Sequence, residues 1–317
     1  MNTQKQQYND HYPVLLKEVL SHLENGADKH YLDCTFGAGG YSRAILENFA
    51  GKLTAFDQDK YVMPFATKIK EQFGQRFHFV QDNFASASRH NLGLFDAVIL
   101  DLGVSSMQLD TLERGFSFMR DGPLDMRMSN EGMSAKDVVN NMEEGALADI
   151  IFKYGEEQQS RRIAKFIVNA RQAGEINTTM QLADIIKNAI GKGHFKKKID
   201  PATKTFQAIR IYINKELEAL EQLLADSKQL LKENGKLIVV SFHSLEDSIV
   251  KNFFKEHSEK KVARSKYSTL KPNMDPNLWL NIITKKPTTP SEQEIRENIR
   301  SRSAKMRVAQ KRGDDDI

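Results

Sequence analysis

Short apolar runs alternate with amphipathic segments over the first hundred residues, and this alternation predicts an α/β fold. Predicted strands begin at Tyr31 and cover 53–56, 76–80 and 95–101, with helices over about 41–49 and 60–73 between them. Near-continuous apolar strands separated by helices are typical of a parallel sheet that is covered on both faces. In such sheets, ligands bind beyond the carboxyl ends of the strands.

From Val104 to about Lys204 the pattern changes to helical intervals, and no strand is predicted. Two capping-box spacings predict helix starts there, Ser134 with Asp137 and Thr178 with Gln181. A single long helix is then predicted from Phe206 to about Leu231. We therefore expect a sheet domain in two parts, 1–106 and 205–311, around an inserted all-helical domain, 107–204, with a frayed tail at 312–317.

The last part of the chain is predicted to complete the sheet. A strand over 236–243 follows Gly235, and Ser244 with Asp247 begins a helix that extends to His257. Two closing strands are predicted at 278–286 and 304–311. A helix that Ser291 and Glu294 begin lies between them.

A glycine-rich turn follows the first strand and marks a ligand site. Gly37, Gly39 and Gly40 lie where the chain must reverse sharply and bring its backbone close to a ligand. Asp33 precedes the turn, and Asp57 follows the second strand, where a carboxylate can accept hydrogen bonds from a ribose. The pattern predicts a site for a nucleoside cofactor.

The residues around the turn favour S-adenosylmethionine (SAM) over a dinucleotide. A dinucleotide fingerprint needs a third glycine at position 42, where this chain has Ser42. Asp33 would repel phosphate but suits a ligand with a sulfonium and an ammonium group. NAD, or a tight turn with no ligand, are the two alternatives to SAM.

Acidic residues end four predicted strands at one rim: Asp33, Asp57, Asp82 and Asp101. Asp101 lies where an acceptor would meet the methyl donor, and its carboxylate could orient an exocyclic amine. The alternative is that it caps the loop or contacts the cofactor. His243 also lies at this rim and could titrate near neutral pH, although a structural role is the alternative.

The composition of the chain indicates where in the cell the protein works. No apolar run approaches the length of a membrane span, the N-terminus lacks a signal-peptide core, and Cys34 is the one cysteine. We therefore expect a cytoplasmic protein with no metal site and no membrane partner. The net charge is only +4, but basic residues cluster at 192–198, at 260–271 and from Arg296 to Arg307. Such clusters fit either an RNA-contacting surface or an ordinary solvated one.

The chain resembles the family of small-subunit ribosomal RNA methyltransferases H (the RsmH or MraW type) over nearly its whole length. The 114–127 stretch (RGFSFMRDGPLDMR) is dense in glycine, charge and aromatic residues, and its composition predicts a functional loop. This stretch and the 241–247 segment (SFHSLED) are the most specific matches. The others are 11–16 (HYPVLL), 33–42 (DCTFGAGGYS), 101–106 (DLGVSS), 154–157 (YGEE), 201–210 (PATKTFQAIR) and 300–305 (RSRSAK).

The resemblance implies a class I SAM-dependent methyltransferase with a Rossmann-like sheet and an inserted helical domain. Its implied activity is methylation of the N4 amine of one cytidine in the decoding region of small-subunit (16S) rRNA. The substrate is free rRNA or an assembling small subunit, and a homodimer is compatible with the sequence. The alternative function is a non-catalytic RNA-binding assembly factor with a relic SAM pocket. An NAD-dependent oxidoreductase is disfavoured by Ser42.

The resemblance also assigns roles to residues. Asp101 is expected to be catalytic, Asp57 to bind the ribose and Phe84 to cover the adenine. Position 41 departs from the family, which usually has histidine there, so only a backbone role is expected of Tyr41. The full set of expected cofactor contacts is Gly39, Gly40, Tyr41, Asp57, Phe84, Asp101 and Gln108, and the expected substrate contacts are Ser105, Ser241 and His243.

Overall fold

The structure is a computed structural model, and it describes residues 13–191, 200–258 and 277–313. The chain divides into two compact units, one formed by 1–103 with 219–317 and the other by 104–218. The first is called the sheet unit and the second the helical unit. The basic clusters at 192–198 and 260–271 lie outside the described residues, as do residues 314–317 of the expected tail.

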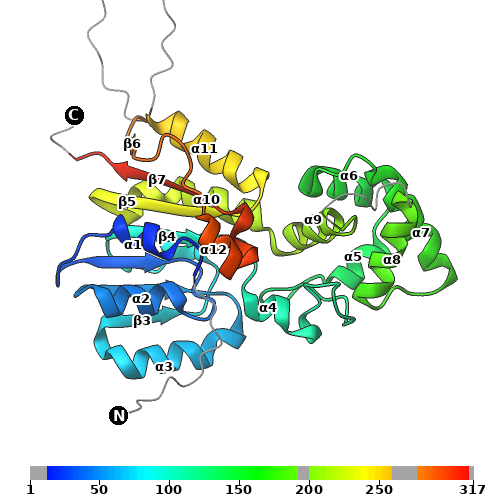
Figure 1. The fold of residues 1–317 in the computed structure, drawn as a ribbon, viewed down its shortest axis with the longest axis horizontal. Coiled ribbons are helices and arrows are strands. Elements are labelled where there is room, and N and C mark those ends of the chain that lie inside the picture. The colour runs from blue at the N-terminus through cyan, green and yellow to red at the C-terminus, as the bar shows by residue number, and fades with distance from the viewer. Residues whose placement is uncertain (1–12, 192–199, 259–276, 314–317) are drawn as a thin grey trace, which may run out of the picture. The chain divides into compact units, whose positions relative to one another are not determined.

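The sheet unit is built on strands in the order β3-β2-β1-β4-β5-β7-β6, seven among the described residues (Figure 1). The first five are parallel, and β7 is antiparallel to both of its neighbours. The strands are β1 (His30–Asp33), β2 (Lys52–Phe56), β3 (Phe77–Val80), β4 (Phe95–Asp101), β5 (Leu231–Ser241), β6 (Leu280–Ile282) and β7 (Lys305–Lys311).

The chain order creates a switch point between β1 and β4. After β1 the chain passes through α2 (Gly40–Asn48) to β2 on one side, and through α3 (Met63–Phe73) to β3. It then returns to place β4 on the other side of β1. Connections that leave two neighbouring strands in opposite directions open a crevice at their carboxyl ends. Asp33 and Asp101 are the last residues of these two strands.

Alternation along the strands separates the two faces of the sheet. Leu32 and Leu100 lie in a core cluster with residues of α10 (Glu216–Leu230) and α11 (Ser244–Ser258). Their neighbours Tyr31 and Asp33 point to the opposite face, where Tyr31 contacts Phe49 at the end of α2. Because Asp33 is in register with Ile99, two residues before Asp101, both acids lie on the α2 face.

Shorter elements complete the sheet unit. They are α1 (Leu16–Ser21), η1 (Lys60–Val62), η2 (Gly74–Arg76), η3 (Phe84–Arg89), α12 (Glu292–Glu297) and η6 (Ile299–Ser303). Ser291 accepts a hydrogen bond from the Glu294 N–H at 3.2 Å, so the predicted start of α12 is confirmed.

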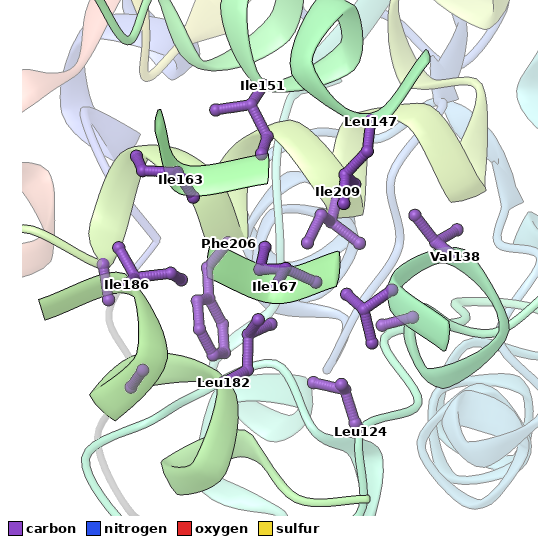
Figure 2. Packing of buried hydrophobic residues seen from close by; sticks show 14 of the residues in the cluster. Leu124, Val138, Leu147, Ile151, Ile163, Ile167, Leu182, Ile186, Phe206 and Ile209 are labelled. Carbon is purple, nitrogen blue, oxygen red and sulfur yellow. The ribbon is translucent and has the colours of Figure 1, made fainter. Parts of the chain in front are cut away.

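The helical unit packs around an apolar core, in which Ile163, Ile167 and Leu182 are fully buried (Figure 2). Both predicted capping boxes are present, at Ser134 and Thr178. Its elements are α4 (Ser106–Asp110), η4 (Leu112–Arg114), α5 (Ala135–Asn141), α6 (Glu144–Gly155), α7 (Ser160–Ala173), α8 (Thr179–Ile190) and α9 (Thr203–Asn214).

The prediction of one helix over 206–231 was wrong. The chain breaks at Lys215, whose φ of 50° ends α9 and lets α10 begin at Glu216. A charged pair between Arg210 and Glu216, with N–O distances of 2.8 and 3.0 Å, closes this corner. Strand β5 then begins at Leu231 instead of after Gly235.

The helical unit covers 104–218, whereas 107–204 was the range expected from sequence. Helix α9 belongs to it because Phe206 and Ile209 are buried in the same cluster as Ile167. An apolar helix face goes with the core that buries it, and sequence periodicity does not say which core that is. Figure 2 shows Ile209 directed at the α7 residue Ile167 and the Phe206 ring beside Leu182 of α8.

Candidate cofactor site and acidic edge

The glycine turn links β1 to α2 and is held to the end of β2. Gly37 donates its N–H to Asp57 Oδ2 at 2.8 Å, and Gly39 donates to the Phe36 carbonyl at 2.7 Å. Gly39 has a φ of 79°, and a Cβ there would lie 2.5 Å from Ile69 Cδ1. A Cβ on Gly40 would lie 2.5 Å from Pro13 Cγ. Both positions therefore require glycine for the turn itself, which leaves the backbone N–H groups of the turn as the means of contacting a ligand.

Asp57 lies immediately after β2, and its carboxylate can accept more hydrogen bonds than the two described below. Its Oδ1 accepts from the Asp59 N–H at 2.8 Å, and its Oδ2 accepts from Gly37. Each carboxylate oxygen has a second lone pair, which suits the two hydroxyls of a ribose. Burial raises the pKa of Asp57 to about 6, against the effect of the Asp59 and Gly37 hydrogen bonds.

Asp33 is fully buried at the end of β1. It accepts from Ser42 Oγ at 2.6 Å and from the Thr35 N–H at 3.2 Å. Burial raises the pKa of Asp33 to about 6, although both hydrogen bonds act in the opposite direction. Position 42, where a dinucleotide fingerprint would have glycine, thus carries a hydroxyl that fixes the acid.

Asp101 ends β4 and is the acid with the fewest partners. Its backbone N–H donates to Thr35 Oγ at 2.8 Å, but its Oδ1 is shielded from solvent and has no hydrogen-bond partner within the described ranges. Burial, and then the charges of Asp33 and Glu246, raise the pKa of Asp101 well above its usual value. A buried oxygen of this kind calls for an explanation, and a ligand that donates to it is one.

Tyr41 lies in the first turn of α2 with its side chain buried. Its hydroxyl donates to the Val14 carbonyl, and Leu15 donates its N–H to Glu294 Oε1 at 2.8 Å. Burial raises the pKa of Tyr41 well above its usual value. The Tyr41 side chain therefore anchors the segment before α1, and what it retains for a cofactor is its backbone.

Phe84 opens η3 after β3 and is half-buried against the core cluster that α10 and α11 also form. Asn83 before it accepts from the Ala85 N–H at 2.9 Å. Asp82 is bonded to Ser86 at 2.7 Å and to His90 at 2.9 Å. Asp82 also accepts from the Asn83 N–H at 2.7 Å, so three hydrogen bonds hold the carboxylate at the β3 end in place.

The segment after β5 turns back on itself. Glu246, which is 2% exposed, accepts from the backbone N–H groups of Phe242 at 2.8 Å and His243 at 3.3 Å. The ring of His243 lies with Nε2 3.1 Å from Glu246 Oε1. Ser241 is buried and donates to the Lys305 carbonyl at 3.3 Å, beside the start of β7.

Ser105 and Gln108 belong to the helical unit. They form the capping box of α4, in which Ser105 Oγ accepts from the Gln108 N–H at 3.2 Å. The Gln108 side chain in turn accepts from the Ser105 N–H at 3.0 Å. This pairing shapes the start of α4, and any contact with substrate or cofactor stays a prediction.

The stretch 114–127, expected to be a functional loop, uses its charged groups internally. Arg114 is buried and donates to the carbonyls of Arg127 at 2.9 Å and Met128 at 3.0 Å. Asp125 holds the Arg127 guanidinium at 2.7 and 3.0 Å. A Cβ on Gly115, whose φ is 68°, would lie 2.2 Å from the Pro123 carbonyl. The glycine and charge in this stretch thus build the loop itself.

Sequence reasoning missed Glu246 and did not place Asp33 among the site residues. Glu246 lies in the first turn of α11, where an acid ordinarily indicates a helix cap, and its place in the 241–247 match was the signal that could have found it. Asp33 was visible as the acid before the turn. The structure brings Asp33, Asp101 and Glu246 to the carboxyl ends of β1, β4 and β5, which are adjacent in the sheet.

The strand order, the glycine turn after β1 and the acid after β2 define a class I SAM-dependent methyltransferase. The acids fit the donor, because an excess of buried negative charge suits a sulfonium and an ammonium group. The chain belongs to the MraW methylase family, whose model matches residues 8–312.

Relatives in this family align over nearly their whole length. The chain is 58% identical over 303 residues to a protein of Rickettsia prowazekii (strain Madrid E) named "Ribosomal RNA small subunit methyltransferase H", covering 95% of this chain and 98% of the relative. A protein of the same name from Rickettsia canadensis (strain McKiel) is 57% identical over 301 residues, covering 94% and 97%.

Solved structures are more distant. A putative rRNA methylase from Clostridium thermocellum aligns with a TM-score of 0.43 and 11% identity, covering 93% of this chain and 95% of that one. A putative methyltransferase from Streptococcus mutans in complex with SAH aligns with a TM-score of 0.43 and 10% identity, covering 93% and 97%. The family is thus established by sequence.

No helix in the described part of the chain has the length and apolar character that a membrane span needs. No cluster of three or more His, Cys, Asp or Glu side chains suited to a metal ion occurs in this part of the chain either.

Proposed function

We propose that this protein transfers a methyl group from SAM to the N4 amine of a cytidine in the decoding region of small-subunit rRNA. The relatives' names and the family resemblance support the choice of substrate. The acidic edge of the sheet unit supports the proposed methyl transfer. On this proposal the substrate is rRNA, free or in an assembling small subunit, and the protein works in the cytoplasm.

The residues around the glycine turn would hold the donor. Asp57 would accept the ribose hydroxyls, and the backbone of Gly39, Gly40 and Tyr41 would line the turn. Phe84 follows the end of β3, where it would contact the adenine. Asp33 would balance the positive charge of the donor from within the sheet. When bound, SAM supplies an electrophilic methyl group.

Asp101 would orient the acceptor. The N4 amine of cytosine is a weak nucleophile because its lone pair is delocalised into the ring. A carboxylate that accepts one N–H of this amine holds the nitrogen in place and directs its lone pair outward. Positioning of this kind contributes much of the rate in transfer reactions. Ser105, Gln108, Ser241 and His243 stay proposed contacts on the acceptor side.

One observation supports this role above the others: the Asp101 Oδ1 atom, buried at the end of β4, lacks a hydrogen-bond partner in the described part of the chain. An unsatisfied buried acceptor costs about 1–3 kcal/mol, and more when charged. A site that binds an amine would relieve this cost on binding.

The direct test has two parts. Nucleoside mass spectrometry of small-subunit rRNA from cells lacking the protein should show one decoding-region cytidine without its N4-methyl group. The purified protein should restore that group on isolated subunits in the presence of SAM. An unchanged rRNA in the deletion strain would refute the substrate. SAM binding without any methyl transfer would instead favour a non-catalytic assembly factor.

A further inference from the structure

A buried carboxylate holds the turn between β5 and α11. Glu246 accepts two consecutive backbone N–H groups, from Phe242 at 2.8 Å and His243 at 3.3 Å. Its own N–H donates to His243 Nδ1 at 3.4 Å, and its Oε1 lies 3.1 Å from Nε2 of the same ring. Both nitrogens of His243 therefore face Glu246, and the histidine is part of the turn.

This turn abuts the segment after Asp101. Gly103 has a φ of 98°, and a Cβ there would lie 3.7 Å from Cδ2 of the Phe242 ring. Leu102 donates its N–H to the Val240 carbonyl at 2.9 Å, so the ends of β4 and β5 are joined next to this contact. Any change in the Glu246 clamp would therefore be transmitted to the backbone that carries Asp101.

The charges around Asp101 have the same sign. Asp33 acts on it from β1 and Glu246 from α11, both as negative groups. Tyr41, from α2, is also within electrostatic reach, but it is neutral and its hydroxyl is bonded to Val14. His243 faces Glu246 instead. Glu246 is thus one of two charges that bias Asp101, and the one that no sequence motif assigned to the site.

We propose that Glu246 is a positioning residue for the methyl transfer: its carboxylate fixes the Phe242–His243 turn beside Asp101 and sets the charge that Asp101 carries before the donor binds. The proposal rests on the proposed function in one respect, the use of Asp101 toward the acceptor. It adds a residue outside the SAM contacts and a measurable link between donor binding and protonation.

The proton balance follows from the charges. Two neighbouring carboxylates favour the neutral, protonated form of Asp101 in the free protein. A cationic donor at the same edge favours the ionised form, so binding releases a proton to solvent and leaves a carboxylate. During transfer, N4 forms a bond to the methyl carbon as the carbon–sulfur bond breaks, and N4 then loses one proton, which the Asp101 carboxylate can accept.

The test compares proton release on binding. Isothermal calorimetry of the purified protein with SAM, in two buffers of different ionisation enthalpy, gives the number of protons released. SAH, which lacks the sulfonium charge, is the ligand control. We expect the wild-type protein to release more protons with SAM than with SAH. In Glu246→Gln this difference should shrink, because one of the negative charges that favour the protonated form of Asp101 is gone.

The kcat of the same variant, and its dependence on pH, provide a second test. In Glu246→Gln, kcat should fall about tenfold or more, because a neutral amide oxygen holds the two backbone N–H groups that donate to Oε2 less strongly than a carboxylate does. The acidic limb of its kcat profile should move to lower pH, because one negative neighbour of Asp101 is gone. A residue with a merely structural role would lower kcat without moving the limb.

Two further variants are controls. Asp247→Asn changes another buried acid in the same turn of α11, but one that pairs with Arg307 at 2.6 Å and Lys305 at 3.2 Å. It should lower the melting temperature and leave proton release unchanged. Glu246→Asp keeps the charge with a shorter reach, so it should lower kcat while the acidic limb stays in place. If Glu246→Gln does not fold, the wild-type comparison still tests the proposal, because equal proton release with SAM and with SAH would overturn it.

The outcomes separate the two proposals. Equal proton release by wild type and Glu246→Gln, or a shifted limb in Glu246→Asp, would overturn the role of Glu246. Normal proton release by a wild-type protein that leaves rRNA unmethylated would refute the proposed substrate and leave the charge-setting role of Glu246 standing.

Discussion

The two units bury charged groups in opposite ways. In the helical unit, Arg114 is buried against two backbone carbonyls, and Asp125 is matched by Arg127. At the edge of the sheet unit, Asp33 and Glu246 are buried, and the Oδ1 atom of Asp101 is shielded from solvent within electrostatic reach of both acids. Burial would raise the pKa of Asp125, but the hydrogen bonds and charge of Arg127 outweigh it and hold that pKa below its usual value. The pKa values of Asp33 and Asp101 are raised instead.

This difference distinguishes structural charge from functional charge. A buried ion that has a partner completes a fold, whereas buried acids of the same sign reduce the stability of the free protein. An arrangement of the second kind is typical of a site that binds a cation or moves a proton. We therefore propose that the sheet edge carries the chemistry, whereas the charged groups of the 114–127 loop stabilise the loop through contacts within the helical unit.

Replacing Asp101 should have the largest effect. In Asp101→Asn we expect methyl transfer to fall by about 10²-fold or more, because the amide cannot serve as a carboxylate acceptor. SAM affinity should change much less, and the melting temperature should not fall, because Asp101 Oδ1 has no hydrogen bond to lose among the described residues. Methylation kinetics, calorimetry and thermal melts would measure the three quantities.

Asp125→Asn is the matched control, because it makes the same change in the helical unit. There it removes the partner of Arg127 and should destabilise the protein by about 1–3 kcal/mol. If both substitutions lowered the melting temperature alike, the distinction between the two units would not hold.

A substitution that leaves a cavity in the core of the helical unit should lower stability without altering the acids of the sheet unit. Ile167 is fully buried at the centre of Figure 2, and Ile167→Ala should destabilise the protein by about 2–5 kcal/mol. Denaturant unfolding measures this loss. SAM affinity under native conditions should stay within about twofold of wild type, because no predicted SAM contact of the sheet unit is altered. A large loss of affinity would contradict an independent cofactor site.

Asp57→Asn should weaken SAM binding by about 10- to 100-fold, which corresponds to one lost charge-assisted hydrogen bond. The amide retains one acceptor, so either the Gly37 or the Asp59 N–H loses its partner as well. Calorimetric titration measures the affinity. Unchanged binding would show that the donor does not use this carboxylate.

Lowering the pH should weaken SAM binding. The pKa values of Asp33 and Asp57 are raised to about 6, so at about pH 5 each is mostly protonated and loses its attraction for a cation. We expect SAM affinity to fall about tenfold for each acid involved between about pH 7 and pH 5. SAH should show a weaker dependence. An affinity that rose at low pH would contradict the assignment.

The stability of the free protein should change in the other direction. Because the folded pKa of Asp33 lies above its ordinary value of 3.8, the folded state holds this proton more tightly than the unfolded state. The stabilisation is complete below about pH 4 and is lost as the pH rises through about 6. An Asp33→Asn variant should lack this part of the pH dependence in denaturant titrations.

Local patterns predicted much of the sheet unit. The β4 boundaries, the glycine turn and both capping boxes are as expected, because each depends on a few adjacent residues. The prediction of one helix over 206–231 was wrong because Lys215 adopts a conformation that is uncommon for a residue with a side chain. The internal contacts of the 114–127 stretch could not be predicted, because partners such as Asn214, which bonds Met128 at 2.7 Å, lie far along the chain, and its role as a functional loop stays a prediction.

The sequence alone determined the family, the order of strands and helices, and the acids that end the strands, since these are properties of short segments and their spacing. Only the tertiary structure decided which acids are buried together. It placed Asp33 and Asp101 on one face of two adjacent strands and added Glu246, a residue whose sequence indicates a helix cap. The physical reason is that burial and electrostatic coupling depend on distances between strands, and these distances exist only once the sheet has formed.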